Sequence, residues 1–321
     1  MFYRAAQRGD NGFFKYLATL VAVFVAFIIG QIPLLFVIDL FSGKTSRGAA
    51  AMAEFQESMD FAVLGISQNL ALFLVLLAFV AALGTLYLCI RFLHHKRLAD
   101  VLTGRRQLDW RRIWFSFGFW FGLSLLLELV GYWLNPENYT LKFDLWLFLP
   151  LLVIALFILP LQTTFEEAMF RGYLMQGLGL LFRNRWIPLL ATSITFGLLH
   201  ISNPEIAQFG LALMMPYYIG FGLLMGICTL MDEGTELALG LHAATNIYGA
   251  TIVSFAGSAL QTPTIFRLRE LDPIQVLIAA FVSAMLFLLV ASRRYGWRDW
   301  GKLFRPLPPS TPLPEVESDM E

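Results

Sequence analysis

The chain has 321 residues, of which 58% are hydrophobic and 14% are charged, and its mean hydropathy is +0.66. Soluble domains carry about a quarter charged residues, so this composition excludes an ordinary soluble protein and predicts a polytopic membrane protein. The formal net charge is zero and no basic patch is interleaved with aromatic residues, which argues against a nucleic-acid partner.

Three apolar runs lie in the first part of the chain, at about 14–41, 69–93 and 113–134. Each is long enough to cross the hydrocarbon core of a bilayer, and the first is too long for a cleaved signal sequence. The loop after the second run is the most basic in the chain, so the positive-inside rule predicts that it and the N-terminus are cytoplasmic. Its cationic residues are His94, His95, Lys96, Arg97, Arg105, Arg106, Arg111 and Arg112.

Residues 142–182 are apolar but contain Pro160, so they form either two short segments or one long bent helix. Later apolar runs lie at about 186–201, 208–231, 236–255 and 273–291. The basic clusters that begin at Arg183 and Arg293 are both cytoplasmic only if residues 142–182 cross the membrane once. We therefore predict an all-α fold: a transmembrane bundle of about eight helices in the cell (inner) membrane, with both termini cytoplasmic.

Neither the end of the chain nor the two cysteines indicate a functional site. Residues 305–321 contain five prolines and four acidic residues, a composition that predicts disorder. Cys89 and Cys228 both lie in apolar runs, which excludes a disulfide framework and a cysteine-based metal site.

Glu166, Glu167 and Arg171 place three ionisable side chains in a sequence that is otherwise apolar enough for a membrane span. On a helix, Glu167 and Arg171 share one face at i,i+4 with the acid first, which is the favourable order for an ion pair. Glu166 points roughly a quarter-turn away. Because an unpaired ionisable group in a bilayer costs on the order of 3 kcal/mol or more, we interpret Glu166 as a functional group.

Two of the four histidines lie inside apolar runs. His200 follows Phe196 at i,i+4, and His242 precedes Asn246 at the same spacing, so each pair shares one helix face. A single buried histidine is more often a satisfied polar group than a catalyst. Two histidines, an amide and an unpaired carboxylate on nearby spans are each costly to bury, which favours one shared cavity.

This set of side chains suits hydrolysis by an activated water. A carboxylate beside an imidazole can hold and deprotonate a water molecule. A second imidazole and an amide can donate hydrogen bonds to the oxyanion that forms when an acyl carbon becomes tetrahedral. The chain has no Gly-x-Ser-x-Gly motif, and no Ser or Cys falls at a helix turn beside either histidine in an evident dyad, so a nucleophilic side chain is not indicated.

Three blocks in this order, Glu166-Glu167-x-x-x-Arg171, Phe196-x-x-x-His200 and His242-x-x-x-Asn246, resemble the motifs of the CAAX prenyl endopeptidases of type II, also called the CPBP intramembrane proteases and including the lysostaphin-resistance-like proteins. The resemblance covers about residues 162–248. It implies that Glu166 and His200 activate the water and that His242 and Asn246 form the oxyanion hole. It also implies that Glu167, Arg171 and Phe196 support the site structurally.

The resemblance further implies where the catalytic core lies and what its partner is. It places the core, with an intramembrane cavity, in residues 141–292. Residues 1–140 are expected to form transmembrane helices without a recognisable motif, and the composition of residues 293–321 predicts a cytoplasmic basic segment followed by a disordered tail. The expected substrate is a membrane-associated or lipidated protein or peptide, and no cofactor is expected.

Three alternatives stay open on the sequence. Glu166, His200 and His242 would make a two-histidine, one-carboxylate zinc site, although they lack the local His-Glu-x-x-His spacing. A proton-coupled transporter would use the same residues as a relay, but the chain shows no internal repeat. A non-proteolytic scaffold or regulatory protein would keep the fold without using these residues.

Glu128 is expected to reach an interface or a loop cation, and the aromatic residues 115–120 are expected to face lipid.

Overall fold

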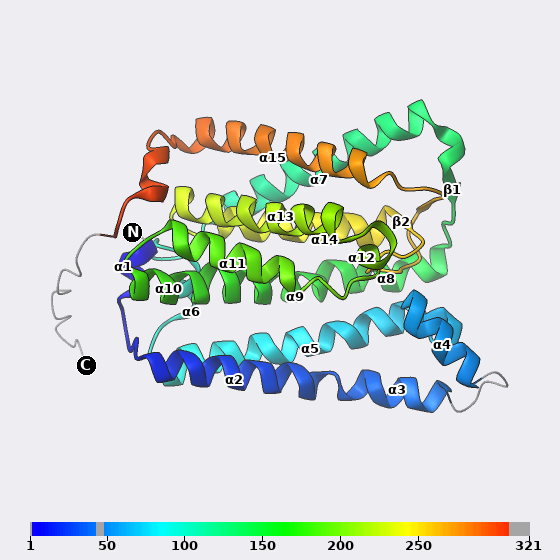
Figure 1. Ribbon diagram of the computed structural model, residues 1–321, viewed down its shortest axis with the longest axis horizontal. Coiled ribbons are helices and arrows are strands. Elements are labelled where there is room, and N and C mark those ends of the chain that lie inside the picture. Colours follow the sequence, from blue (N-terminus) through cyan, green and yellow to red (C-terminus); the bar gives the residue numbers. More distant parts are fainter. Residues whose placement is uncertain (1, 43–47, 308–321) are drawn as a thin grey trace.

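The computed structural model describes residues 2–42 and 48–307, and its helices lie side by side along the long axis of the molecule (Figure 1). Six helical segments in these ranges are long and apolar enough to cross a membrane. They are Phe13–Phe41, Gln68–Leu93, Trp110–Leu134, Leu145–Phe182, Leu211–Asp232 and Pro273–Tyr295. The all-α transmembrane fold predicted from the sequence is therefore confirmed.

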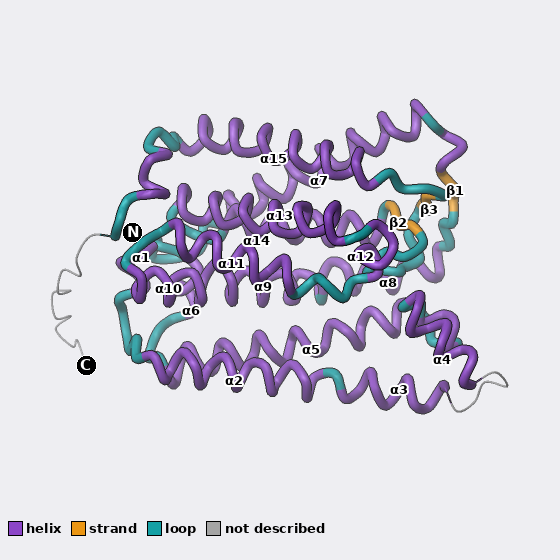
Figure 2. Tube along the Cα trace, in the orientation of Figure 1, coloured by secondary structure: helices purple, strands orange, loops and turns teal. Residues whose placement is uncertain are grey.

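Within these segments the helices are α2 (Phe13–Gly30), α3 (Ile32–Ser42), α5 (Gln68–Leu88), η2 (Cys89–Leu93), α7 (Trp110–Leu134), α8 (Leu145–Phe157), α9 (Leu159–Glu167), η4 (Ala168–Leu174), α10 (Met175–Phe182), α13 (Leu211–Asp232) and α15 (Pro273–Tyr295). The shorter helices are α1 (Phe2–Ala6), α4 (Gly48–Ser58), η1 (Phe61–Leu64), α6 (Leu98–Leu102), η3 (Pro136–Asn138), α11 (Trp186–Leu198), α12 (Pro204–Phe209), α14 (Glu236–Thr251) and η5 (Trp300–Phe304). Most loops lie at the two ends of the bundle (Figure 2).

The two remaining predicted spans are the shorter helices α11 and α14, which pack along α13 and α7 respectively. At 1.5 Å per residue, the 13 residues of α11 extend for about 20 Å, less than the roughly 30 Å of the hydrocarbon core. Most residues of α14 are buried, among them Leu237, Leu241 and Ala244. The bundle therefore consists of six long helical segments with α11 and α14 packed among them.

Residues 145–182 form one continuous helical segment and not two separate short spans. Asp144 caps its start, since the carboxylate accepts from the amides of Trp146 and Leu147. Pro160 is accommodated in the first turn of α9, where a missing amide proton is tolerated. The segment places Glu166 in the interior of the molecule, where α9 contacts α5 and α14.

The start of the chain is packed against the bundle. In α1, Phe2 and Ala6 are fully buried, and the Phe2 amide donates to Glu233 Oε2 at 2.8 Å. Lys302 Nζ in η5 lies 3.1 Å from Glu233 Oε1. The described parts of both chain ends therefore meet at the turn between α13 and α14. Residues 308–321, which make up most of the tail expected to be disordered, lie outside the described residues.

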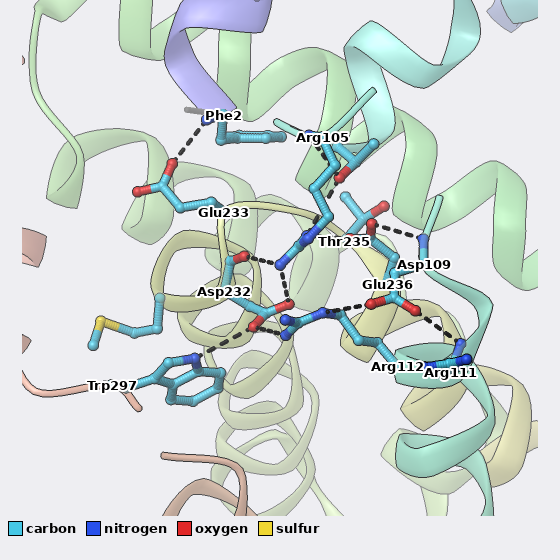
Figure 3. A network of polar contacts seen from close by, with 12 residues as sticks. Phe2, Arg105, Asp109, Arg111, Arg112, Asp232, Glu233, Thr235, Glu236 and Trp297 are labelled. Carbon is cyan, nitrogen blue, oxygen red and sulfur yellow. Dashed lines mark hydrogen bonds and ion pairs between the residues drawn. The ribbon is translucent and has the colours of Figure 1, made fainter. Parts of the chain in front are cut away.

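A polar network fixes the start of α14 at this same end (Figure 3). Arg105 contacts Asp232 Oδ2 at 3.0 Å and Glu236 Oε2 at 3.1 Å, and both carboxylates are almost completely buried. Further contacts to Asp232 come from Arg112 and from the Trp297 indole. Because Glu236 is the first residue of α14, the network sets the position of the helix that carries His242 and Asn246.

The opposite end of the bundle carries a small sheet that the all-α prediction did not include. Its strands are β1 (Tyr139–Leu141), β2 (Val253–Phe255) and β3 (Phe266–Leu268), in the order β1-β3-β2. Tyr139 pairs with Leu268 in an antiparallel ladder, and Val253 pairs with Phe266 in a parallel one. The sheet ties the loop after α7 to the segment between α14 and α15. The division into three domains stays a prediction.

Candidate active site

Glu167 lies at the centre of a buried ionic triad. Its Oε1 atom accepts from Arg171 Nη1 at 2.9 Å and from His242 Nδ1 at 2.7 Å. Glu167 and Arg171 are fully buried, and His242 is 3% exposed. The ion pair expected from the i,i+4 spacing is present, and the same carboxylate also orients the imidazole of α14. Since a carboxylate only accepts hydrogen bonds, Nδ1 of His242 carries a proton.

The segment that follows the two glutamates is a π-helix, η4, and not the regular α-helix assumed from the sequence. π-Helical turns are rare and occur frequently at functional sites. Arg171 lies within η4, and its Nη2 atom donates to the carbonyl of Gly222 on α13 at 3.4 Å. At Gly222 an added Cβ would lie 3.1 Å from the Ser193 backbone, so a side chain there would push α11 away from α13.

Glu166, which precedes Glu167 on α9, also points toward His242. Its Oε1 atom accepts from Gln162 Nε2 at 2.7 Å, and its Oε2 atom lies 3.4 Å from His242 Nε2. Among the described residues, Oε2 has no hydrogen-bond donor although it is buried. A buried carboxylate oxygen without a donor is costly, so this atom requires a further partner such as water or substrate.

Gln162 is a site residue that the sequence interpretation missed. Its amide nitrogen donates to Glu166, and its amide oxygen accepts from Asn246 Nδ2 at 3.0 Å. Gln162 therefore joins the carboxylate of α9 to the amide of α14. Its i,i+4 spacing from Glu166 was a signal in the sequence, but nothing local identified Asn246 as its second partner.

His200 lies in the turn after α11, where its Nδ1 atom is 2.7 Å from the carbonyl of Phe196. A carbonyl only accepts, so Nδ1 carries the proton and Nε2 of the neutral ring is an acceptor. No hydrogen bond or ion pair in the described chain joins His200 to Glu166. The imidazole that faces Glu166 most closely is that of His242, whereas the resemblance pairs Glu166 with His200.

The ring of Phe196 contacts both histidines of the site and the Arg171 guanidinium. Its ring centroid is 4.6 Å from that of His200 and 5.9 Å from that of His242. The Arg171 guanidinium lies 4.3 Å from the same ring, at a distance suited to a cation–π contact. Phe196 is 2% exposed, so one aromatic ring on α11 packs against the groups of α14 and η4 together.

The short length of α11 explains how His200 and His242 come to lie near the same aromatic ring. His242 is two turns into α14, which begins at the network of Arg105 and Glu236. His200 follows the end of α11, which is only 13 residues long. A helix that spanned the full bilayer would carry His200 beyond the depth of His242.

The zinc alternative would require Glu166, His200 and His242 to bind one metal ion together. In residues 2–42 and 48–307, no three His, Cys, Asp or Glu side chains are arranged to hold a metal ion together. His242 uses Nδ1 for Glu167, and His200 uses Nδ1 for a carbonyl, so each imidazole has only Nε2 left for another partner.

Glu128 lies outside the site and forms a pair of hydrogen bonds with tyrosines. Its Oε1 atom accepts from Tyr139 at 2.6 Å, and its Oε2 atom accepts from Tyr248. Of the two expectations for Glu128, the described residues show tyrosine partners where a loop cation was one possibility, and the membrane interface stays a prediction. The expectation that residues 115–120 face lipid was wrong in part, since Trp120 is 7% exposed and packs against Phe287 on α15.

Comparisons with known proteins bear on the family. Residues 145–248 match the family model described as Type II CAAX prenyl endopeptidase Rce1-like, and this range contains all seven motif residues. The chain is also 28% identical over 267 residues to YyaK of Bacillus subtilis (strain 168), an uncharacterized protein, with 83% of this chain and 86% of YyaK covered. No solved structure matches the chain. The family match confirms the resemblance found in the motifs.

Proposed function

Because the chain carries an Rce1-like domain of the type II CAAX prenyl endopeptidases, a family of intramembrane proteases, we propose that it hydrolyses a peptide bond of a membrane-associated or lipidated protein substrate. The site lies on helices of a multi-pass integral membrane protein, so the substrate meets it from the bilayer or its surface. The hydrolysis uses a water molecule activated by glutamate and histidine, and no side chain of the protein becomes acylated.

One observation supports this proposal: within residues 2–42 and 48–307, no group donates to the buried Glu166 Oε2 atom, which lies 3.4 Å from His242 Nε2. Since none of the described residues donates to this oxygen, a water molecule can bind there without displacing another donor. Glu166 Oε1 is held by Gln162, which leaves Oε2 as the free end of the carboxylate. A water bound there donates one proton to Glu166 in the reaction.

In the proposed mechanism, His200 Nε2 accepts the second hydrogen of the water as a hydrogen bond and so orients the attacking oxygen. One O–H bond of the water breaks as its proton moves to Glu166 Oε2, the water oxygen forms a bond to the carbonyl carbon, and the carbonyl oxygen becomes an oxyanion. The protonated Glu166 then gives its proton to the leaving nitrogen as the C–N bond breaks. Base and acid are thus the same carboxylate at two stages.

Asn246 and His242 supply the oxyanion hole in this mechanism. Asn246 uses one amide hydrogen for Gln162, and its second hydrogen is available to the oxyanion. His242 donates to the oxyanion from Nε2 when that nitrogen carries a proton, and its ring is held in place by Glu167 Oε1, which accepts from Nδ1 at 2.7 Å. Preorganised donors of this kind stabilise the tetrahedral intermediate without reorganisation.

The orientation in the membrane follows from the charge of the loops. The end of the bundle that holds α1 and η5 also holds the loop from Lys96 to Arg112. By the positive-inside rule, we therefore place this end of the bundle, and both chain ends, on the cytoplasmic side of a cell (inner) membrane.

The function can be tested with purified protein in lipid nanodiscs. We expect hydrolysis of a peptide that ends in a farnesylated CAAX sequence, or of a transmembrane peptide without a prenyl group, with the two arms separating the substrate classes. Mass spectrometry of the products locates the bond. Glu128→Gln, which removes a carboxylate that accepts from Tyr139 and Tyr248 and has no role in the proposed mechanism, is the control and should stay active. If the wild-type protein hydrolyses neither peptide, the proposed activity is contradicted.

A strong chelator is expected to leave the hydrolysis rate unchanged, because water activation in this proposal needs only Glu166 and His200. The measurement is the rate before and after treatment with phenanthroline, together with elemental analysis of the purified protein. Full inactivation, recovery on adding zinc, and one zinc ion per chain would instead make Glu166, His200 and His242 metal ligands.

A further inference from the structure

His200 has an aromatic neighbour on α13 that no sequence motif includes. The rings of His200 and Tyr218 are stacked, with centroids 4.5 Å apart and an interplanar angle of 23°. Aromatic pairs at such separations attract each other beyond the area that they bury. This stack is closer to parallel than the contact between His200 and Phe196, which has an angle of 47°.

His200 needs such a neighbour because its backbone gives it little restraint. It lies two residues beyond the end of α11, in a turn, and its side chain is only partly buried. The hydrogen bond from Nδ1 to the Phe196 carbonyl fixes one point of the ring, but the ring can still tilt about that point. A flat ring stacked against the imidazole removes this tilt.

Tyr218 is itself held at its hydroxyl group by the segment that follows His200. Asn203 Nδ2 donates to the hydroxyl at 3.0 Å, and the hydroxyl lies 3.5 Å from Glu205 Oε2. Glu205 is 8% exposed, and its other oxygen accepts from the Ala259 amide at 2.6 Å. The tyrosine ring is therefore fixed at both ends, by the backbone of α13 and by polar contacts from residues 203–205.

We propose that Tyr218 is a positioning residue, whose stacked ring keeps His200 Nε2 directed toward the water that Glu166 activates. This inference rests on the proposed function, because it assigns His200 a part in holding that water. Tyr218 touches neither the water nor the substrate in this assignment and acts only through the imidazole. The ring carries the effect, and the hydroxyl serves to hold the ring in place.

The kinetic test compares Tyr218→Leu, Tyr218→Phe and Tyr217→Leu in nanodiscs. Small misplacements of a catalytic group can cost about 10²-fold, so Tyr218→Leu should lower kcat by about 10- to 10²-fold with little change in KM. Tyr218→Phe keeps the ring and should retain most of the activity. Tyr217 is a control, because it is the neighbouring, partly buried tyrosine on α13 and packs edge-on against Tyr218, with no stacking contact to His200 among the described residues.

Wild-type activity in Tyr218→Leu would overturn the proposal, and so would a loss in Tyr218→Phe as large as that in Tyr218→Leu. Thermal unfolding of each variant separates a loss of catalysis from a loss of fold. If Tyr218→Leu unfolds, Tyr218→Met fills the space with a flexible side chain without a ring and is judged by the same criteria.

A second readout does not depend on activity. The chain has four histidines, so selective ¹⁵N-histidine labelling gives few signals, and His200→Gln identifies the one from His200. We expect a single tautomer with the proton on Nδ1 in the wild type and exchange between states in Tyr218→Leu. An unchanged single tautomer in Tyr218→Leu contradicts the positioning role. Absence of hydrolysis by the wild type contradicts the proposed function instead, and the two failures remain distinguishable.

Discussion

Glu166→Gln is expected to lower the rate of peptide hydrolysis by about 10²- to 10⁴-fold, the usual contribution of a general base. Glutamine keeps the volume and the acceptor for Gln162 Nε2, which lies 2.7 Å from Glu166 Oε1. Its amide nitrogen would occupy the place of Oε2, 3.4 Å from His242 Nε2, and cannot take a proton from water. The fold should therefore persist while the chemistry is lost. The measurement is kcat in nanodiscs, with a thermal melt of each preparation.

Asn246→Ala provides an internal comparison for this prediction. Loss of one oxyanion donor costs about 3 kcal/mol in transition-state stabilisation, so a residual rate should survive. Glu128→Gln removes a carboxylate bonded only to two tyrosines and should keep the wild-type rate. A Glu166→Gln protein with unchanged rate would remove Glu166 from the chemistry. If the cellular phenotype also survived in Glu166→Gln, a scaffold role would be favoured.

Arg171→Ala is expected to destabilise the protein by about 3–5 kcal/mol, the cost of breaking a buried ion pair by removing one partner. Arg171 and Glu167 are both fully buried, and Arg171 also donates to Gly222 and lies over the ring of Phe196. The variant leaves the Glu167 carboxylate with His242 as its remaining partner. Since whole domains are stable by only about 5–15 kcal/mol, the yield of folded protein should fall clearly. The measurement is the thermal midpoint and the monodisperse yield in detergent.

Two variants make this test specific to the ion pair. Arg183→Ala removes an exposed arginine at the end of the same helical segment and should leave the thermal midpoint unchanged. The double variant Glu167→Gln with Arg171→Met removes both charges and should be less destabilised than Arg171→Ala, because no buried charge is left unpaired. A stable, well-folded Arg171→Ala protein would show that the pair does not hold the bundle together.

Local patterns were sufficient for several features of this protein. The apolar runs set the membrane class and most helix positions, because a helix must satisfy its backbone within its own segment in lipid. The i,i+4 spacing of Glu167 and Arg171 was enough to predict their ion pair, because side chains four residues apart lie on the same face of a helix. In the structure, Arg171 Nη1 lies 2.9 Å from Glu167 Oε1. In the same way, the order and spacing of the three motifs were enough to indicate the family.

Only the tertiary structure decided which groups on different helices meet. The contacts of His242 with Glu167, of Gln162 with Asn246 and of Tyr218 with His200 join residues 18 to 84 positions apart, beyond the reach of any local spacing. Burial of α1 and the network around Asp232 also depend on loops that meet at one end of the bundle. The physical reason is that helical periodicity fixes the face of a side chain on its own helix. The rotation and depth of each helix in the bundle follow from packing against its neighbours and from the anchors at its ends.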